Sequence, residues 1–255
     1  MAGVKQGRDG AVGILTLSEP ESLNAMTPDL LGALARAIAE MTADPSIRAL
    51  VLTGEGRGFC SGQNLKASEA LGQDIVTGVM KFYWPAFKAL RECRVPIVVA
   101  VNGVAAGGGF SLAMAGDMIV AARSANFMFS RIGLVPDLGS TWLLPRLIGR
   151  QRALELMLFN EPLSAERARE WGLVREVVDD AQLMSEAVKL AQRLAQGPTR
   201  ALVATRMLLE ESEHATYAAQ FRREIEVQSE VRHSADALEG RAAFVEKRKA
   251  SFSGR

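Results

Sequence analysis

The chain has 255 residues, of which 48% are hydrophobic and 23% are charged. A chain of this length and composition can bury one large core, so disordered and fibrous classes are excluded. The formal net charge of +1 gives no general attraction to nucleic acid. Its two cysteines, Cys60 and Cys93, are too few for a disulfide framework or a structural zinc cluster. We therefore expect a globular protein with no metal site and no nucleic-acid partner.

No run of residues approaches the roughly 18 to 20 apolar residues of a membrane span. Residues 1–10 also lack the apolar stretch of a signal peptide. The one short basic run, 247–249, fits a solvated helix end as well as it fits a local phosphate contact. We expect a cytoplasmic protein that does not contact a membrane.

Apolar runs and helix-start signals alternate along the first two hundred residues. Strands are expected where apolar residues are continuous, and helices where they recur at helical spacing. The expected strands are 12–17, 48–53, 96–101 and 117–122. One helix is expected to begin at 27–28, and two more are expected over 76–93 and 110–115. This alternation predicts an α/β fold with parallel strands and helices outside.

The composition of the sequence changes after about Pro198. From there to Lys249 the chain is rich in helix formers and carries no strand signal. We divide the chain into an α/β core, 1–198, and a helical region, 199–255. A helical tail of this kind docks on its own core or on a neighbouring subunit, so an oligomer is plausible.

Two strand-to-helix junctions are rich in small residues. Residues 101–112, VNGVAAGGGFSL, pass through three consecutive glycines, and residues 59–66, FCSGQNLK, follow the second strand. Glycines let a ligand lie against backbone N–H groups, although close helix–strand packing is the alternative. Two converging N–H donors make an oxyanion hole. In the second junction, we interpret Cys60 as a small buried hydrophobe and Asn64 as a cap or turn residue.

With both junctions, the chain resembles the enoyl-CoA hydratase/isomerase family, the crotonase superfamily. The resemblance covers nearly the whole length, and the segments that carry it are SLNA at 22–25, FCSGQNLK at 59–66, VNGVAAGGGFSLAMAGD at 101–117, IGLVPDLGSTWLLPRLIG at 132–149 and LSAERAREWGLV at 163–174. It implies a crotonase-like spiral of ββα turns with a C-terminal helical trimerisation region. It also implies a homotrimer or hexamer and an acyl-CoA thioester substrate, whose coenzyme A is part of the substrate, so no separate cofactor is expected.

The same resemblance assigns site residues. The backbone N–H groups of Gln63 and Gly108 match the family's oxyanion donors. The positions that match its coenzyme A contacts are Asn24, Ala25, Gly62, Lys66, Phe244 and Lys247, of which the last two would reach a coenzyme A bound by a neighbouring subunit.

The family's hydratase branch uses two glutamates, and neither is found here. Ser111 stands at the first position, and the second maps to Arg131, in a segment around 127–131 that is about two residues shorter than usual. Between Asn102 and Asp137 the only acidic residue is Asp117, which lies where a strand leads away from the glycines. A hydratase with two carboxylates is therefore disfavoured.

Asp137, in VPDLGS at 135–140, is the remaining candidate for acid–base chemistry. Here the chain most resembles the family's isomerases, including the 3-enoyl-CoA to 2-enoyl-CoA and the 1,2-epoxyphenylacetyl-CoA isomerases. In these, an acidic residue after this proline acts on the acyl chain. One carboxylate can remove a proton from C2 and return it at C4, and burial among Leu134, Leu138 and Trp142 would raise its pKa. The alternative is a turn residue that caps the next helix.

Two other reactions, hydrolysis by a serine nucleophile and dehalogenation, each lack a residue that they need. A nucleophilic Ser111 needs a base, and the two histidines, His214 and His233, lie in the helical tail. The family's dehalogenases pair an aspartate with a histidine and a tryptophan, but Lys88 and Phe129 stand near those two positions.

Two further alternatives stay open. One is a hydratase that lacks the glutamate pair, and the other is a non-catalytic member that binds acyl-CoA or RNA. The near-zero net charge argues against RNA. Phe82, Trp84 and Trp142 could line an aromatic pocket for the acyl group, although such residues more often belong to a core.

Overall fold

The computed structural model describes residues 3–129 and 132–255. The strands are β1 (Gly3–Asp9), β2 (Val12–Ser18), β3 (Ala49–Gly54), β4 (Gly58–Cys60), β5 (Ile97–Val101), β6 (Val104–Ala106), β7 (Met118–Ala122), β8 (Asn126–Met128), β9 (Leu163–Ser164) and β10 (Glu176–Val178). The α-helices are α1 (Pro28–Ala43), α2 (Ile75–Phe82), α3 (Trp84–Arg91), α4 (Gly108–Met114), α5 (Ser140–Ile148), α6 (Arg150–Phe159), α7 (Ala165–Glu170), α8 (Leu183–Ala195), α9 (Thr199–Ser212), α10 (Tyr217–Val231) and α11 (Ala235–Val245).

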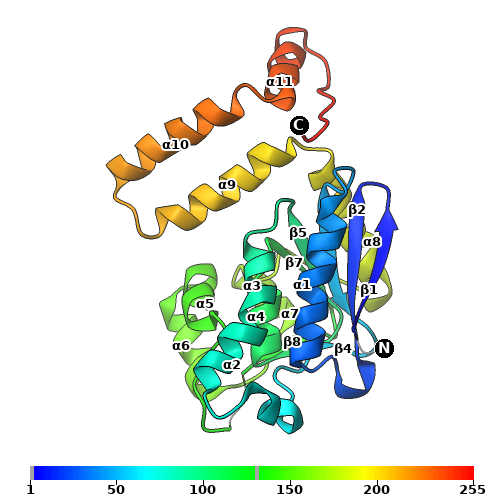
Figure 1. The fold of residues 1–255 in the computed structure, drawn as a ribbon, viewed down its shortest axis with the longest axis vertical. Coiled ribbons are helices and arrows are strands. Elements are labelled where there is room, and N and C mark those ends of the chain that lie inside the picture. Colours follow the sequence, from blue (N-terminus) through cyan, green and yellow to red (C-terminus); the bar gives the residue numbers. More distant parts are fainter. Residues whose placement is uncertain (1–2, 130–131) are drawn as a thin grey trace.

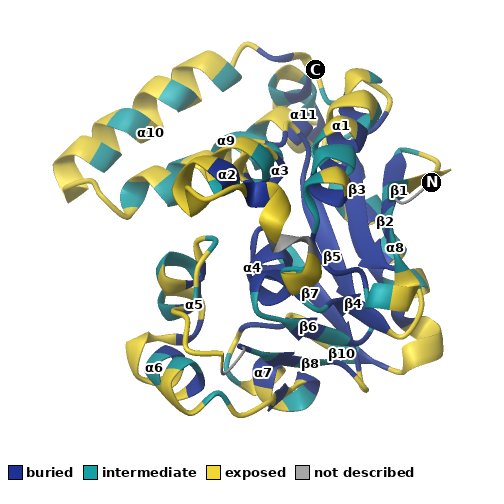
Figure 2. Cartoon of the chain, turned by 60° about the horizontal axis from the view of Figure 1, so that its bottom comes forward, coloured by how far each residue is buried: buried dark blue, intermediate teal, exposed yellow. Residues whose placement is uncertain are grey.

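The strands form a large and a small sheet. The large sheet has the order β1-β2-β3-β5-β7-β10, and all its neighbours are parallel except β1 and β2. Its central strands β3 and β5 are buried along their whole length, as expected for parallel strands covered on both faces. Helix α8 packs on β3 and β5, and α1 packs on β1 and β2. Figure 2 shows the resulting buried layer between helices with exposed outer faces.

The small sheet, β4-β6-β8-β9, is built from continuations of the large one. Each of β3, β5 and β7 is followed within a few residues by a short strand, β4, β6 or β8, and then by helical structure. This repeated ββα unit places β4 and β6 side by side in parallel. The loops that follow these two strands therefore leave the small sheet next to each other.

The predicted strands 12–17, 48–53, 96–101 and 117–122 are confirmed to within a residue or two. The helix predicted over 76–93 is wrong in one respect, because it divides at Tyr83 into α2 and α3. Pro85 lies in the first turn of α3, and its missing N–H interrupts the helical ladder. The three-residue strands of the small sheet are too short to show a periodic pattern.

After Gly197 the chain forms three helices. Helices α9 and α10 pack against each other and extend from the body, and α11 lies at the end of the tail (Figure 1). The tail is tied to the core by Arg48, whose guanidinium donates to Phe252 O at 2.6 Å and to Thr199 Oγ1 at 3.1 Å. Within the described residues, none of the helices is both long enough and apolar enough to cross a membrane.

Candidate active site

The two glycine-containing loops lie against each other. A Cβ atom on Gly62 would come within 2.7 Å of the Ala106 carbonyl oxygen and 3.3 Å of the Gly108 nitrogen. Gly62 also has a φ of 92°, which other residues rarely adopt. A side chain at Gly109 would collide with the Cys60 carbonyl. The glycines thus serve close packing, and this packing brings the backbones of the two loops together.

Two backbone N–H groups are left unpaired where the loops meet. The backbone of Met26 forms hydrogen bonds with the residues before and after Gln63. Met26 N donates to Gly62 O at 2.7 Å, and Asn64 N donates to Met26 O at 3.0 Å. Gln63 N and Gly108 N, the first nitrogen of α4, donate no hydrogen bond to any part of the chain that the structure describes.

A small cavity opens at this junction. Its volume is about 190 Å³. Gln63 and Gly108 line it from the two loops, and Asp137 lines it from the segment before α5. The remaining lining residues are Ser61, Gly62, Leu65, Gly107, Phe129, Ile132, Leu134, Val135, Pro136 and Met157. The two unpaired N–H groups and one carboxylate therefore share one cavity.

Asp137 is held in an unusual loop. The two residues after it, Leu138 and Gly139, have φ values of 52° and 84°. Gly139 caps α5, and no side chain bonds to the free N–H groups of that helix. The alternative of Asp137 as a helix cap is therefore wrong. Desolvation raises the pKa of Asp137 above its ordinary value, against a smaller lowering by its own backbone N–H. The residue is nevertheless exposed in the single chain and Leu134 is 69% exposed, so the predicted burial among Leu134, Leu138 and Trp142 is wrong.

Asp137 also lines a second, larger cavity of about 680 Å³. Its walls are mostly apolar and aromatic. The lining residues are Val79, Met80, Trp84, Phe87, Arg91, Glu92, Ala115, Asp137, Leu138, Gly139, Trp142, Leu143, Glu210 and His214. The predicted aromatic pocket is thus present with Trp84 and Trp142, whereas Phe82 packs against the hydrophobic core instead.

His214 was not expected in this cavity. It follows α9, and its ring centroid lies 6.2 Å from that of Trp142. Sequence separation from the glycines argued that it was distant, but the tail folds back over the core. No local sequence signal could have shown this contact, because it depends on how α9 docks.

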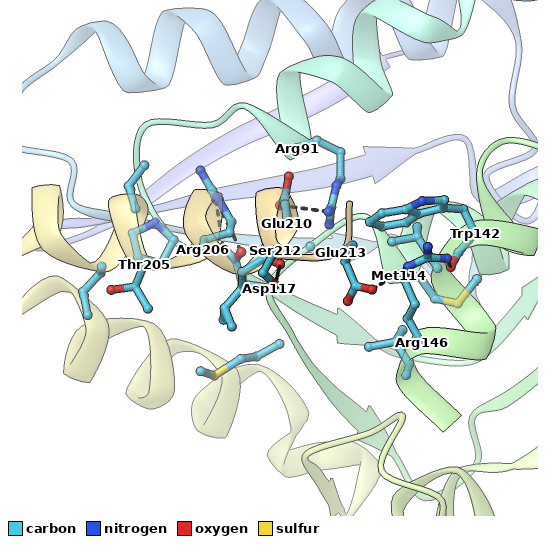
Figure 3. A pocket seen from close by; sticks show the side chains of 18 of the residues that line it. Arg91, Met114, Asp117, Trp142, Arg146, Thr205, Arg206, Glu210, Ser212 and Glu213 are labelled. Carbon is cyan, nitrogen blue, oxygen red and sulfur yellow. Dashed lines mark hydrogen bonds and ion pairs between the residues drawn. The ribbon is translucent and has the colours of Figure 1, made fainter. Parts of the chain in front are cut away.

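Ion pairs fix α9 on the body (Figure 3). Arg206 lies 3.1 Å from Asp117, and Arg91 lies 2.8 Å from Glu210. A further pair joins Arg146 to Glu213, the residue before His214, at 3.1 Å. These pairs border a pocket of about 530 Å³ between α9 and the core. Asp117 is therefore used to hold the tail and does not line the small cavity.

The residues expected to contact coenzyme A are dispersed. Asn24 is fully buried, and its amide donates to Glu55 O at 3.0 Å and to Gly58 O at 2.9 Å. Its side chain therefore braces the loops, which corrects the expectation that it lines a ligand channel. Ala25 is 7% exposed and lies outside both cavities. Lys66 is exposed and adjoins a residue of the small cavity, Leu65.

Phe244 and Lys247 are not brought to these cavities. Phe244 is 85% exposed on α11, and Lys247 follows that helix with a φ of 53°. Helix α11 lies away from α4 and α5 in the same chain (Figure 1). Any contact of these residues with a ligand at Asp137 would have to involve another subunit.

The other candidate nucleophiles are occupied or buried. Burial raises the pKa of the Cys60 thiol to about 12, so Cys60 is an inert hydrophobe as predicted. Ser111 is 1% exposed, and its hydroxyl donates to the Asp137 carbonyl oxygen at 3.1 Å. Lys88 lies beside Glu92 at 3.8 Å, with half of its side chain in solvent. Arg131, the match to the second hydratase glutamate, lies outside the described residues. The predicted capping role of Asn64 is confirmed by its bond from Lys66 N at 3.1 Å.

No group of three or more histidine, cysteine, aspartate or glutamate side chains that could hold a metal ion is found among residues 3–129 and 132–255. The small cavity contains one carboxylate and backbone N–H groups. These groups can exchange a proton and donate hydrogen bonds to an oxygen.

Known proteins resemble this chain over almost its whole length. The family model described as enoyl-CoA hydratase/isomerase matches residues 7–255. The chain is 43% identical to the 1,2-epoxyphenylacetyl-CoA isomerase of Escherichia coli over 247 residues, covering 94% of each chain. It is 42% identical to a probable enoyl-CoA hydratase of Rhodobacter capsulatus over 248 residues, covering 95% of this chain and 94% of the relative.

Solved structures share the fold. An enoyl-CoA hydratase from Bacillus anthracis superposes with a TM-score of 0.91 at 28% identity, covering 99% of both chains. One from Polaromonas sp. JS666 gives 0.90 at 35% identity, covering 98% of this chain and 99% of the other. The predicted α/β fold of crotonase type is confirmed, and the chain belongs to the enoyl-CoA hydratase/isomerase family.

Proposed function

We propose that the protein is an acyl-CoA isomerase that shifts a double bond or rearranges an epoxide through a thioester enolate. The observation that carries this proposal is the position of Asp137. Asp137 lines both the small cavity with the unpaired N–H groups and the large aromatic cavity. One carboxylate between a thioester site and an acyl site is what such an isomerase needs.

In the double-bond shift, the thioester carbonyl oxygen accepts hydrogen bonds from Gln63 N–H and Gly108 N–H. Ionised Asp137 removes a proton from C2, and the electron pair moves onto the carbonyl oxygen to give a dienolate. The two N–H groups stabilise that oxygen, and removing one such donor costs about a hundredfold to a thousandfold in rate in comparable enzymes. Protonated Asp137 then delivers its proton to C4, the double bond forms between C2 and C3, and the carboxylate is restored.

The raised pKa of Asp137 suits this cycle. Desolvation disfavours the charged carboxylate, so Asp137 is a stronger base than a fully solvated aspartate. A base whose pKa lies closer to the working pH transfers protons in both directions more efficiently.

The large cavity supports an aromatic or unsaturated acyl group. Trp84, Phe87 and Trp142 present rings on its walls, and aromatic rings attract one another in tilted or offset stacks. The relative from Escherichia coli is named for a phenylacetyl substrate. We therefore propose that aryl thioesters are among the substrates, bound as acyl-CoA without a separate cofactor.

Hydration is the second candidate, favoured by the names of several relatives. Against it, Asp137 is the one carboxylate among the described residues that line the small cavity. Addition of water by the family's usual route uses two.

We also propose a homotrimer or hexamer. Helix α10 buries none of its residues in a single chain, and it exposes Tyr217, Phe221 and Ile225. Large apolar side chains exposed together on one helix are typical of interaction surfaces. In such an assembly Phe244 and Lys247 would reach the coenzyme A of a neighbour, and light scattering of the purified protein tests the subunit number.

The Asp137→Asn variant tests the proposed reaction. We expect the rate on 3-enoyl-CoA and 1,2-epoxyphenylacetyl-CoA to fall by orders of magnitude, because the amide cannot accept the C2 proton. Binding of coenzyme A thioesters should persist, which titration calorimetry measures. Crotonyl-CoA is the control substrate for hydration, and full activity of Asp137→Asn on the isomerase substrates would refute the assignment.

A further inference from the structure

Ser111 occupies the place where hydratases of the family carry a glutamate, and it is bonded to the Asp137 loop. Its hydroxyl donates to the Asp137 carbonyl oxygen at 3.1 Å. The same oxygen accepts from Ser140 N at 3.0 Å. Both bonds act on the backbone of the residue whose side chain is the proposed base, so the carboxylate itself stays free to react.

The loop that these bonds hold is strained. Leu138 follows Asp137 with a φ of 52°, a left-handed conformation that is unfavourable for a residue with a side chain. Strained backbone of this kind persists when its surroundings fix it firmly. The Ser111 hydroxyl is such a restraint, since it is 1% exposed and lies on a helix whose residues are all buried.

Ser111 also connects the base to the oxyanion donors. It lies three residues after Gly108 in α4, on the same side of the helix. Leu138 lies close to Gly108, within 2.8 Å of the position that a Cβ there would occupy. One helical turn therefore carries a proposed N–H donor at its start and a tether to the Asp137 loop at its end.

We infer that Ser111 is a positioning residue that sets the distance between the Asp137 carboxylate and the Gly108 N–H group. The inference rests on the proposed function of these two groups. A reacting group displaced by about 1 Å loses about a hundredfold in rate, so the tether matters to turnover more than to substrate binding.

The experiment compares Ser111→Ala with Ser140→Ala. The Ser140 hydroxyl is the matched control, because it is fully buried, lies at the start of α5 and has no hydrogen-bond partner among the described residues. Both variants remove one buried hydroxyl near Asp137. The Ser111 hydroxyl alone is bonded to the loop.

For Ser111→Ala we expect kcat on a 3-enoyl-CoA to fall about tenfold to a hundredfold with KM unchanged. A looser loop lets more water reach the Asp137 carboxyl, so its desolvation lessens and its pKa falls toward the ordinary value. The acid limb of the kcat profile then moves to lower pH. Ser140→Ala should keep the wild-type kcat and profile, and thermal unfolding of both variants shows that each is folded.

Equal kcat values for the two variants, or a loss in Ser111→Ala without movement of the acid limb, would overturn the inference. If Ser111→Ala does not fold, the same comparison is made with Ser111→Cys and Ser140→Cys. Failure of the proposed function shows separately, as full activity of Asp137→Asn. Failure of this inference leaves Asp137→Asn inactive and Ser111→Ala active.

Discussion

The two sides of the candidate site are built differently. The side with Gln63 and Gly108 consists of backbone N–H groups. Paired strands hold these groups in place, together with close contacts at glycines where a Cβ atom would not fit. The side with Asp137 and His214 is made of side chains, brought together by a strained loop and by a docked helical tail. In the proposed reaction, the backbone side supplies a step that many thioester reactions share. The side-chain side would decide which reaction follows and on which acyl group.

The largest effect is expected from the backbone side. In Gly62→Ala the new methyl group would press against the Ala106 carbonyl and toward Gly108 N. The displaced N–H groups should lower kcat/KM about a hundredfold to a thousandfold, measured by steady-state kinetics on a 3-enoyl-CoA.

Gly72→Ala is the matched control for that substitution. Gly72 also has a positive φ, 79°, but a Cβ atom there would meet no described atom within 4 Å. Both variants therefore place a Cβ atom at a positive φ. Activity lost to the same extent in both would show that strain, and not the geometry of the N–H groups, limits the enzyme.

A smaller effect is expected at the far wall of the aromatic cavity. His214→Ala removes a ring near Trp142, and a pair of rings contributes about 0.5 to 1.5 kcal/mol. We expect KM for aryl thioesters to rise about twofold to tenfold, with short linear thioesters affected less. His233→Ala serves as the control, because His233 lines neither cavity. Equal effects of the two variants on aryl and linear substrates would contradict this view of the acyl site.

Local sequence was enough to predict the backbone side. The glycines at 107–109 and at Gly62 lie where neighbouring backbones approach closely. Such approaches require small residues, so a few consecutive residues of the sequence are enough to indicate them. Asp137 was singled out by the resemblance to the family's isomerases, which have an acidic residue after this proline. The upward direction of its pKa agrees with the prediction, although the neighbouring Leu134 and Val135 are largely exposed.

The side-chain side depended on tertiary contacts. The ion pairs of α9 with the core hold His214 at the cavity. Ser111 bonds to Asp137, which lies 26 residues further along the sequence. The division of the second helix at Tyr83, by contrast, had a local signal in Pro85, which the apolar spacing on both sides of it obscured. Contacts between distant segments leave no periodic pattern, so one sequence could not predict them.

The central claim is that Asp137 removes the C2 proton of a thioester held at Gln63 and Gly108. Exchange of the C2 protons of phenylacetyl-CoA in deuterated water, followed by NMR, tests this step without any need for a complete reaction. We predict that the wild-type enzyme catalyses the exchange and that Asp137→Asn, although it still binds the thioester, does not. Exchange at the wild-type rate in Asp137→Asn would contradict the account.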